Sequence, residues 1–491
     1  MVFSSPGFLF LFLPIFLILY FLVGKRLQNP FLVVASLIFY AWGEPKYVFV
    51  LITSIILNHI FGNYVSDELR NGRAKRAKLL LGLAVALNLA LLFGFKYVNF
   101  FAASLSSGLN LVGWKSIYIT SSPVSFPIGI SFFTFSAISY IVDIYRKEAV
   151  FDRNPINTAL YISLFPKLLA GPIVQYRHIA NQIAERSITM DKFADGVKRF
   201  IIGLGKKVLI ANTLGMVADQ IFSLPGGELT VGVSWLGIVC YTLQIYFDFS
   251  GYSDMAIGIG RIAGFDFMEN FNYPYISRSI REFWRRWHIS LSTWLRDYLY
   301  IPLGGNRGKP VRVYFNILIV FFVCGLWHGA AWTFVAWGVW HGVFVLLEHT
   351  KFGQLISRTW SPVRLLYALL VVMIGWVVFR SSDFSYAIAY LEAMFGFGKV
   401  SGPYYSPLMY LNRLVVVALI VGLVGSLPLL PALGRLKDTW YKALEARRRI
   451  ASGLADFSYS FVTLIFLGTI FSISVISMMG ALNNPFIYFR F

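Results

Sequence analysis

The sequence of 491 residues predicts an all-α polytopic membrane protein, and three observations carry that prediction. Hydrophobic residues make up 57% of the chain and charged residues only 13%, whereas soluble proteins have about 25% charged residues. Apolar runs recur that are long enough, or nearly long enough, to cross about 30 Å of hydrocarbon. Basic residues gather in the short connections between these runs. We therefore interpret residues 1–491 as one integral-membrane domain.

The apolar runs, in chain order, are the expected membrane-crossing helices. They are Phe8–Val23, Phe31–Trp42, Tyr47–Val65, Leu79–Val98, Val124–Tyr145, Phe200–Phe222, Val231–Phe249, Val313–Trp327, Phe334–Leu347, Leu365–Val378, Leu408–Leu430 and Phe461–Met479. The first run follows no basic segment and lacks a small-residue cleavage site, so we expect a retained span. A further run, Leu160–Val174, contains Pro166, Gly171 and Pro172, and we expect it to be broken or re-entrant.

The charges of the connections predict the orientation, because cytoplasmic loops carry an excess of Lys and Arg. Basic residues outnumber acidic ones by five to two in Ser66–Lys78, eight to two in Arg278–Arg312 and six to two in Arg435–Arg449. We expect these three segments at the cytoplasmic face. The nearly neutral loops Asn99–Pro123 and Ser223–Thr230 then face outward, as does the long loop Ser381–Pro407, and counting the spans places both termini on the periplasmic side.

The net charge of +20 is explained by those loops, because the chain has no separate basic domain that could bind nucleic acid. The same charge suits anionic membrane lipids or a phosphorylated cytoplasmic substrate. The two cysteines, Cys240 and Cys324, lie inside apolar runs without C-x-x-C spacing, and no histidines have metal-ligand spacing. The sequence therefore predicts neither a disulfide framework nor a metal site.

Residues 278–300 combine arginines with tryptophans and contain His288. The tryptophans recur at helical spacing, the arginines form a separate stripe, and Glu282 is placed to pair with Arg286 four residues on. This pattern predicts an amphipathic helix in the cytoplasmic interface, with its arginines on phosphate groups. His288 is the exception, because it shares the tryptophan face instead of the wet one.

His328 ends the apolar run Val313–Trp327 and is followed by Gly329, which permits close backbone approach. An ionisable group at membrane depth is expensive and is a candidate for function. A water-poor site favours the neutral imidazole, which can act as a general base. The alternative is an interior histidine that is hydrogen-bonded across helices. His341 and His349, near the cytoplasmic end of the next span, give a weaker indication of chemistry.

Further ionisable residues fall in or beside apolar runs: Asp143, Lys167, Asp248, Asp254 and Arg261. Their simplest role is to form internal ion pairs and hydrogen bonds that hold broken helices together. The alternative is that they line the substrate path of a transporter or flippase without acyl chemistry.

Five strings of residues, taken together and in order, resemble the membrane-bound O-acyltransferase family. They start at Ser131, Phe165, Phe247, Phe283 and Gly325 and read SFFTFSAISYIVDIYR, FPKLLAGPI, FDFSGYSDMA, FWRRWH and GLWHG. Within that family the chain is most similar to the bacterial alginate O-acetyltransferase branch, the AlgI-like proteins, over essentially its whole length. One departure is Lys167, at a position where relatives often have Gln.

The resemblance implies about eleven transmembrane helices, with re-entrant or broken helices, around a central funnel or tunnel. It also implies that His328 is the catalytic histidine and that His288 holds the family's second polar position. Both would lie near mid-membrane, so the helix with His288 would dip inward. His328 would then accept the proton of an attacking hydroxyl, while His288 would orient the acceptor or donate to the developing oxyanion.

The expected protein is therefore an O-acetyltransferase of the bacterial inner membrane, with no bound cofactor. Acetyl-CoA would be the acyl donor, its phosphates held by Arg281, Arg285 and Arg286. The acceptor would be an exported polysaccharide, namely alginate or, alternatively, peptidoglycan, cellulose or teichoic acid. The resemblance implies a separate periplasmic partner, a serine-hydrolase-like (SGNH) acetyltransferase. Aromatic residues of the outward loops are suited to docking it: Trp114, Tyr118, Phe395, Phe397, Tyr404 and Tyr405.

Overall fold

The computed structural model describes residues 2–111, 126–429 and 449–480, and this part of the chain contains helices and no β-strand. Its helices that are long and apolar enough to cross a membrane are α3 (Val48–Arg70), α4–α5 (Ala74–Asn110), α10–α11 (Met190–Phe222), α12 (Val231–Ile262), α15 (Pro310–His328), α18 (Ser361–Arg380) and Ser460–Gly480 of α22 (Arg449–Gly480). Shorter apolar helices are Phe8–Leu22, which includes α1 (Leu13–Leu22), α6 (Ile130–Tyr145), α16 (Trp332–Leu347) and α20 (Arg413–Gly425). The predicted all-α polytopic fold is confirmed.

Shorter helices fill the rest of the described chain. They are α2 (Gln28–Gly43), α7 (Pro155–Ser163), α8 (Phe165–Leu168), α9 (Tyr176–Ala184), α13 (Ile280–Arg286), α14 (Ile289–Leu295), α17 (Lys351–Arg358) and α19 (Phe384–Met394). The predicted break in Leu160–Val174 is confirmed, because α7 ends at Ser163 and α8 is only one turn. Pro166 lacks a backbone N–H and cannot continue the hydrogen bonding of α7.

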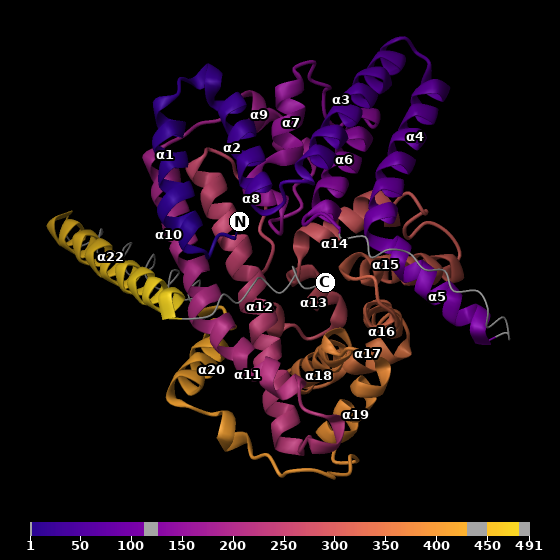
Figure 1. Ribbon diagram of the computed structural model, residues 1–491, viewed down its shortest axis with the longest axis vertical. Helices are drawn as coiled ribbons and strands as arrows, with labels where there is room; N and C mark the ends of the chain where they lie inside the picture. Colours follow the sequence, from indigo (N-terminus) through magenta and orange to yellow (C-terminus); the bar gives the residue numbers. More distant parts are fainter. Residues whose placement is uncertain (1, 112–125, 430–448, 481–491) are drawn as a thin grey trace.

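Helix α12 runs through the middle of the molecule, with α10 and α11 along one side and α13, α16 and α18 on the other, while α22 lies at the periphery (Figure 1). Two pairs of glycines set the contact between α10 and α12. A Cβ on Gly196 or Gly203 would lie 2.6 Å from the carbonyl oxygen of Gly258 or Gly251, respectively. Small residues at these positions let the two backbones touch, as is common where helices associate in membranes.

A basic segment expected at the cytoplasmic face and a segment expected to face outward lie at opposite ends of the molecule. The turn between α3 and α4 is at one end of the molecule and the chain from α19 to α20 is at the other (Figure 1). Several predicted boundaries are wrong: α10 begins at Met190 instead of Phe200, and α12 extends past Phe249 to Ile262. The expected outward loops Asn99–Pro123 and Ser381–Pro407 contain α5 (Val98–Leu111) and α19, respectively. Most of Arg435–Arg449, together with Trp114 and Tyr118, lies outside the described residues.

The predicted internal ion pairs are confirmed for the acidic residues of α12. Asp248 Oδ1 lies 2.5 Å from Lys207 Nζ, and Asp254 pairs with Arg199 Nη2 at 2.8 Å and Lys206 Nζ at 2.7 Å. We call these five residues the ion-paired network. Its lysines lie in a π-helical turn, Lys206–Ala211, between α10 and α11.

Two of the other predicted polar groups, Asp143 and Lys167, are also hydrogen-bonded. Asp143 accepts hydrogen bonds from the Tyr298 hydroxyl at 2.6 Å and from the Arg177 backbone at 3.0 Å. Lys167 is buried on α8, donates to Ser136 Oγ at 3.1 Å and lies 4.5 Å from the centre of the Tyr161 ring. Both contacts hold α8 and α7 against their neighbours. Arg261, near the end of α12, is partly exposed.

Candidate functional site

His328 is the last residue of α15 and is 3% exposed. Glycines bring α15 and α16 into contact beside it. A Cβ on Gly325 would collide with the Phe334 carbonyl group, and one on Gly338 would collide with the Phe321 carbonyl group. These helices can approach so closely only because both positions lack a side chain. The approach holds the end of α15, and therefore His328, against α16.

His288 lies between α13 and α14 in a left-handed backbone conformation, with a φ of 43°. The continuous amphipathic helix predicted for residues 278–300 is therefore wrong. The chain turns at Trp287–His288 so that both side chains are fully buried, as the family resemblance implied for His288. A left-handed residue with a Cβ costs about 1–3 kcal/mol and is found where the surrounding structure over-determines it. The burial of two large rings offsets that strain.

Asn270 fixes the orientation of His288. Its Oδ1 lies 3.1 Å from His288 Nδ1 and also accepts hydrogen bonds from the backbone N–H and the hydroxyl of Ser290, at 3.2 and 2.9 Å. The Asn270 amide nitrogen donates to Ser253 Oγ of α12 at 3.0 Å. Because a carbonyl oxygen only accepts, Nδ1 of His288 carries the proton and Nε2 has the lone pair. Nε2 is buried and has no hydrogen-bond partner in the part of the chain that the structure describes.

The two histidines predicted as catalytic lie side by side. Their ring centroids are 6.4 Å apart, and the Trp327 ring contacts both, at 5.9 Å from His288 and 5.0 Å from His328. Trp337 of α16 closes the other side of His328, at 4.9 Å. Residues that are forty positions apart in sequence therefore share one aromatic enclosure, from which the indole rings exclude water.

His341 belongs to the same enclosure, although its sequence context indicated chemistry less strongly than that of His328. It is fully buried, 5.2 Å from the Trp337 ring, and stacks at 6.0 Å on Phe283. We call His288, His328, His341, Trp287, Trp327 and Trp337 the histidine cluster. Among the described residues, neither ring nitrogen of His341 has a hydrogen-bond partner, and the same is true of the indole N–H groups of these three tryptophans. His349 lies outside the cluster and is exposed.

A polar pocket of about 570 Å³ lies beside α13, the end of α16 and α17. Arg278, Arg281, Arg286 and Arg364 line it, together with the carboxylates of Glu282 and Glu348. The arginines outnumber the carboxylates, so the pocket suits an anion. Arg281 Nε lies 3.3 Å from Glu348 and Arg286 Nε lies 3.0 Å from Glu282, which confirms the predicted pairing of Glu282 with Arg286.

The third arginine of the predicted phosphate site is placed differently. Arg285 is exposed and does not line this pocket. Arg364, at the start of α18, lines it and was missed by the sequence analysis. No local pattern marks Arg364, because it reaches the pocket only after α18 has folded against α16.

One face of α16 leads from this pocket to His328. The residues Trp337, His341, Val345 and Glu348 follow at helical spacing, and all are buried. Glu348 borders the arginine pocket and Trp337 contacts His328. From Trp337 to Glu348 the helix rises by about 17 Å at roughly 1.5 Å per residue. The arginine pocket and the histidine pair are thus two ends of one stripe.

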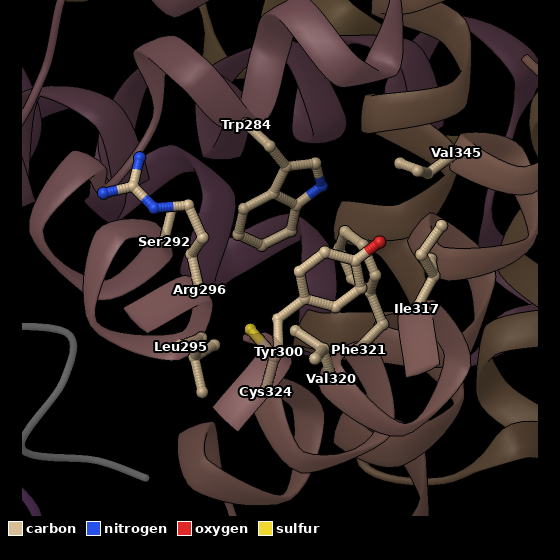
Figure 2. A pocket seen from close by; sticks show the side chains of 10 residues that line it. All are labelled: Trp284, Ser292, Leu295, Arg296, Tyr300, Ile317, Val320, Phe321, Cys324 and Val345. Carbon is tan, nitrogen blue, oxygen red and sulfur yellow. The ribbon is translucent and has the colours of Figure 1, made fainter. Parts of the chain in front are cut away.

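An apolar cavity of about 190 Å³ flanks that stripe. Figure 2 shows the Trp284 ring reaching toward Phe321 and Tyr300, with Arg296 at one edge and Cys324 below. Cys324 lies one helical turn before His328 on α15. The cavity therefore extends from Arg296 at one edge to Cys324, close to the histidine pair, and its lining is apolar.

Comparisons with known proteins identify relatives of this chain. The model of MBOAT, the membrane-bound O-acyltransferase family, matches residues 89–380, which include both histidines of the pair. The probable alginate O-acetylase of Pseudomonas aeruginosa is 44% identical over 456 residues, which cover 93% of this chain and 85% of that protein. The probable alginate O-acetylase of Pseudomonas syringae pv. tomato is 48% identical over 398 residues, 81% of this chain and 76% of that protein. The peptidoglycan O-acetyltransferase of Helicobacter pylori is 37% identical, over 82% of this chain and 81% of that protein.

Proposed function

Because the chain belongs to the membrane-bound O-acyltransferase family, we propose that this O-acyltransferase takes acetyl from cytoplasmic acetyl-CoA and relays it across the membrane for O-acetylation of an exported polysaccharide. The observation that carries the proposal is the buried pair of His288 and His328, which one helix face connects to an arginine-lined pocket. The names of the Pseudomonas relatives favour an alginate-like acceptor. The Helicobacter relative makes peptidoglycan the alternative.

His328 acts as the general base in this proposal. As the acceptor hydroxyl oxygen adds to the thioester carbonyl carbon, its proton moves to His328. The tetrahedral intermediate then collapses, the C–S bond breaks, and the thiolate of coenzyme A takes the proton from His328. Positioned proton transfer of this kind is typically worth about 10²–10⁴-fold in rate.

His288 orients the acceptor. Its Nδ1–H is engaged with Asn270, so the buried Nε2 can accept a hydrogen bond from a hydroxyl but cannot donate one to an oxyanion. Of the two roles expected for His288, this geometry therefore favours orientation. The N–H groups of the neighbouring tryptophans supply donors for the developing oxyanion, where preorganised donors are most effective.

The arginine pocket is the proposed site for the donor phosphates. Arg281 and Arg286 line it, whereas Arg285 is exposed on the same short helix and lies outside the pocket lining. The stripe from Glu348 to Trp337 spans about 17 Å. An extended chain of four or five peptide units, comparable to the arm that carries the thiol of coenzyme A, covers about 14–17 Å. The donor can therefore rest its phosphates on the arginines while its thioester reaches the histidines.

The opposite end of the molecule is the proposed contact for the periplasmic partner. Phe397, Tyr404, Leu408 and Met409, between α19 and α20, each have at least 69% of their surface exposed. Such an apolar and aromatic surface is typical of a protein interface. It faces outward if the chain sits in the inner membrane with both termini periplasmic, as the loop charges favour.

Reconstitution tests the relay. The purified chain in lipid vesicles should cleave acetyl-CoA slowly and should acetylate no polysaccharide until the partner acetyltransferase is added, with a His328→Ala chain plus partner as the matched control. Efficient acetylation of polymer by the chain alone would overturn the relay. Absence of thioester cleavage with and without partner would overturn the acyl chemistry and favour a transporter.

A further inference from the structure

Lys96 is a basic residue inside a membrane-crossing helix for which the proposed reaction has no use. It belongs to a π-helical turn, Phe93–Tyr97, which interrupts the long helix α4–α5. Such turns insert one residue into an α-helix and are frequent at functional sites. A cation at this depth is expensive and requires a partner.

The partner is the end of the helix that carries His328. Lys96 Nζ donates to the carbonyl oxygen of Trp327 at 2.6 Å, and the hydroxyl of Tyr97 donates to the carbonyl oxygen of Leu326 at 2.9 Å. The last carbonyl groups of a helix have no partner within the helix, and the negative end of its dipole favours a cation. The π-helical turn thus caps α15 with two adjacent side chains.

The capped residues are those that set the histidine pair. The Trp327 ring contacts both His288 and His328, and His328 directly follows the carbonyl group that Lys96 holds. A second bond ties Lys96 to the opposite wall, because Nζ lies 3.5 Å from Ser131 Oγ at the start of α6. Lys96 therefore connects three helices at the point where α15 ends.

From this geometry we infer that Lys96 is a positioning residue: its ammonium group fixes the backbone of Trp327 and so holds His328 at the place where it can take the proton of the acceptor. The inference rests on the proposed function, since it assigns Lys96 a part in the same reaction. It predicts an effect on turnover and not on donor binding, because Lys96 does not line the arginine pocket.

The test compares steady-state acetyl-CoA turnover in vesicles, with partner present, for Lys96→Met, Lys96→Arg and Gly94→Ala. A misplacement of about 1 Å lowers kcat by up to roughly 10²-fold, so we expect Lys96→Met to lose at least tenfold in kcat at unchanged KM for acetyl-CoA. Lys96→Arg restores a donor and a charge, and it should recover most of that loss. Gly94→Ala is the matched control, because it alters the same π-helical turn at a position where a Cβ meets nothing within 4 Å.

Three results would overturn the inference. The first is a folded Lys96→Met chain with the kcat of the unmodified chain, and the second is a loss confined to KM. The third applies if Lys96→Met does not fold: Lys96→Arg and Lys96→Gln chains that both fold and both keep full kcat. Gln can donate a hydrogen bond but lacks the charge and the reach of lysine, so its full kcat would show that the ammonium group is not needed. Failure of the proposed function would be distinct, because the unmodified chain itself would then not turn over acetyl-CoA.

Discussion

Two regions of the interior differ in whether their buried polar groups have partners. In the ion-paired network, Asp248 meets Lys207 at 2.5 Å and Asp254 meets two cations within 2.8 Å. In the histidine cluster, Nε2 of His288, both nitrogens of His341 and three indole N–H groups have no hydrogen-bond partner among the described residues. Both regions lie against α12 or its neighbours, so burial alone does not explain the difference.

The histidine cluster gathers six such atoms around the proposed base, which favours it over the ion-paired network as the place where a ligand binds. A buried polar group without a partner costs about 1–3 kcal/mol, and natural proteins leave few of them. The same chain compensates buried charge elsewhere, also outside its spans, as Asp297 shows. Burial raises the pKa of the Asp297 carboxyl, but hydrogen bonds and charges from Arg296, Gln175 and Arg177 outweigh this effect and hold that pKa below its usual range. In the proposed reaction, the open donors and acceptors of the histidine cluster are available to the oxygen atoms of the thioester and the hydroxyl.

The largest expected effect comes from removing the imidazole of His328, the proposed base, from the histidine cluster. His328→Ala should lower acetyl transfer by about 10²–10⁴-fold, because the proton transfer is lost. The amount of folded protein should not change, since a small neutral side chain adds no cost at membrane depth. O-acetyl content of the cellular polysaccharide and membrane level of the protein are the measurements, with His349→Ala as an exposed histidine control. Normal acetylation by His328→Ala would remove the cluster from the chemistry.

The converse is expected in the ion-paired network, where Lys207→Met should damage folding. Lys207 and Asp248 have 4% and 2% of their side chains exposed, and loss of one partner of such a pair typically costs about 3–5 kcal/mol. Thermal unfolding in detergent measures the loss, and Lys207→Met combined with Asp248→Leu should recover most of it. Lys192→Met is the control, because its partner Asp266 is 54% exposed and such pairs are worth about 1 kcal/mol or less. Equal stability of Lys207→Met and Lys192→Met would contradict the contrast between the regions.

A smaller effect should follow from releasing His288. Asn270→Leu removes the acceptor that holds the proton on Nδ1, and the misoriented ring should lower kcat by roughly 10–100-fold. Asn270→Asp keeps an acceptor oxygen and should lose much less. Single-turnover kinetics with acetyl-CoA and partner separate this loss from product release. If both variants have the same kcat, the hydrogen bond from His288 does not orient the acceptor site.

The smallest effect is expected at the arginine pocket. Arg281, Arg285 and Arg286 changed together to Gln should raise KM for acetyl-CoA by about tenfold and leave kcat nearly unchanged, since contacts to remote phosphates bind ground and transition states alike. Lys351→Gln on the adjoining α17 is the control, because Lys351 does not line the pocket. A lower kcat with unchanged KM would assign these arginines to another task, such as holding α13 on lipid headgroups.

The sequence predicts what depends on local pattern. The apolar runs identify the spans, Pro166 marks the break after α7, and the spacing of Glu282 and Arg286 predicts their ion pair. Boundaries fail where polar residues continue a helix inside the protein, as they do along α12 beyond Phe249. Hydropathy cannot recognise such a segment, because its one carboxylate, Asp254, is compensated by Arg199 of α10 and by Lys206 of the π-helical turn that follows.

The candidate site can be predicted only in part from the sequence, for the same reason. His288 and His328 are found through motifs, but the turn at His288 depends on Asn270, which the preceding segment supplies and no motif marks. Arg364 and Lys96 act through helices that meet only in the folded chain. Helical periodicity even misleads at residues 278–300, because an amphipathic pattern does not reveal a left-handed residue that is stabilised by tertiary contacts.

The glycine contact between α10 and α12 has a consequence for how the protein is assembled. These helices, joined through α11 and the short connection from Ser223 to Thr230, can pair as soon as both have left the translocon, since their glycines need nothing from later segments. Ser253 on this early hairpin can accept its hydrogen bond only once Asn270 has been synthesised. The helix with His328 follows later in the chain. During synthesis, Ser253 and Asn270, which support His288, are therefore present before His328 is made. The pair of His288 and His328 can form only after α15 and α16 have been inserted.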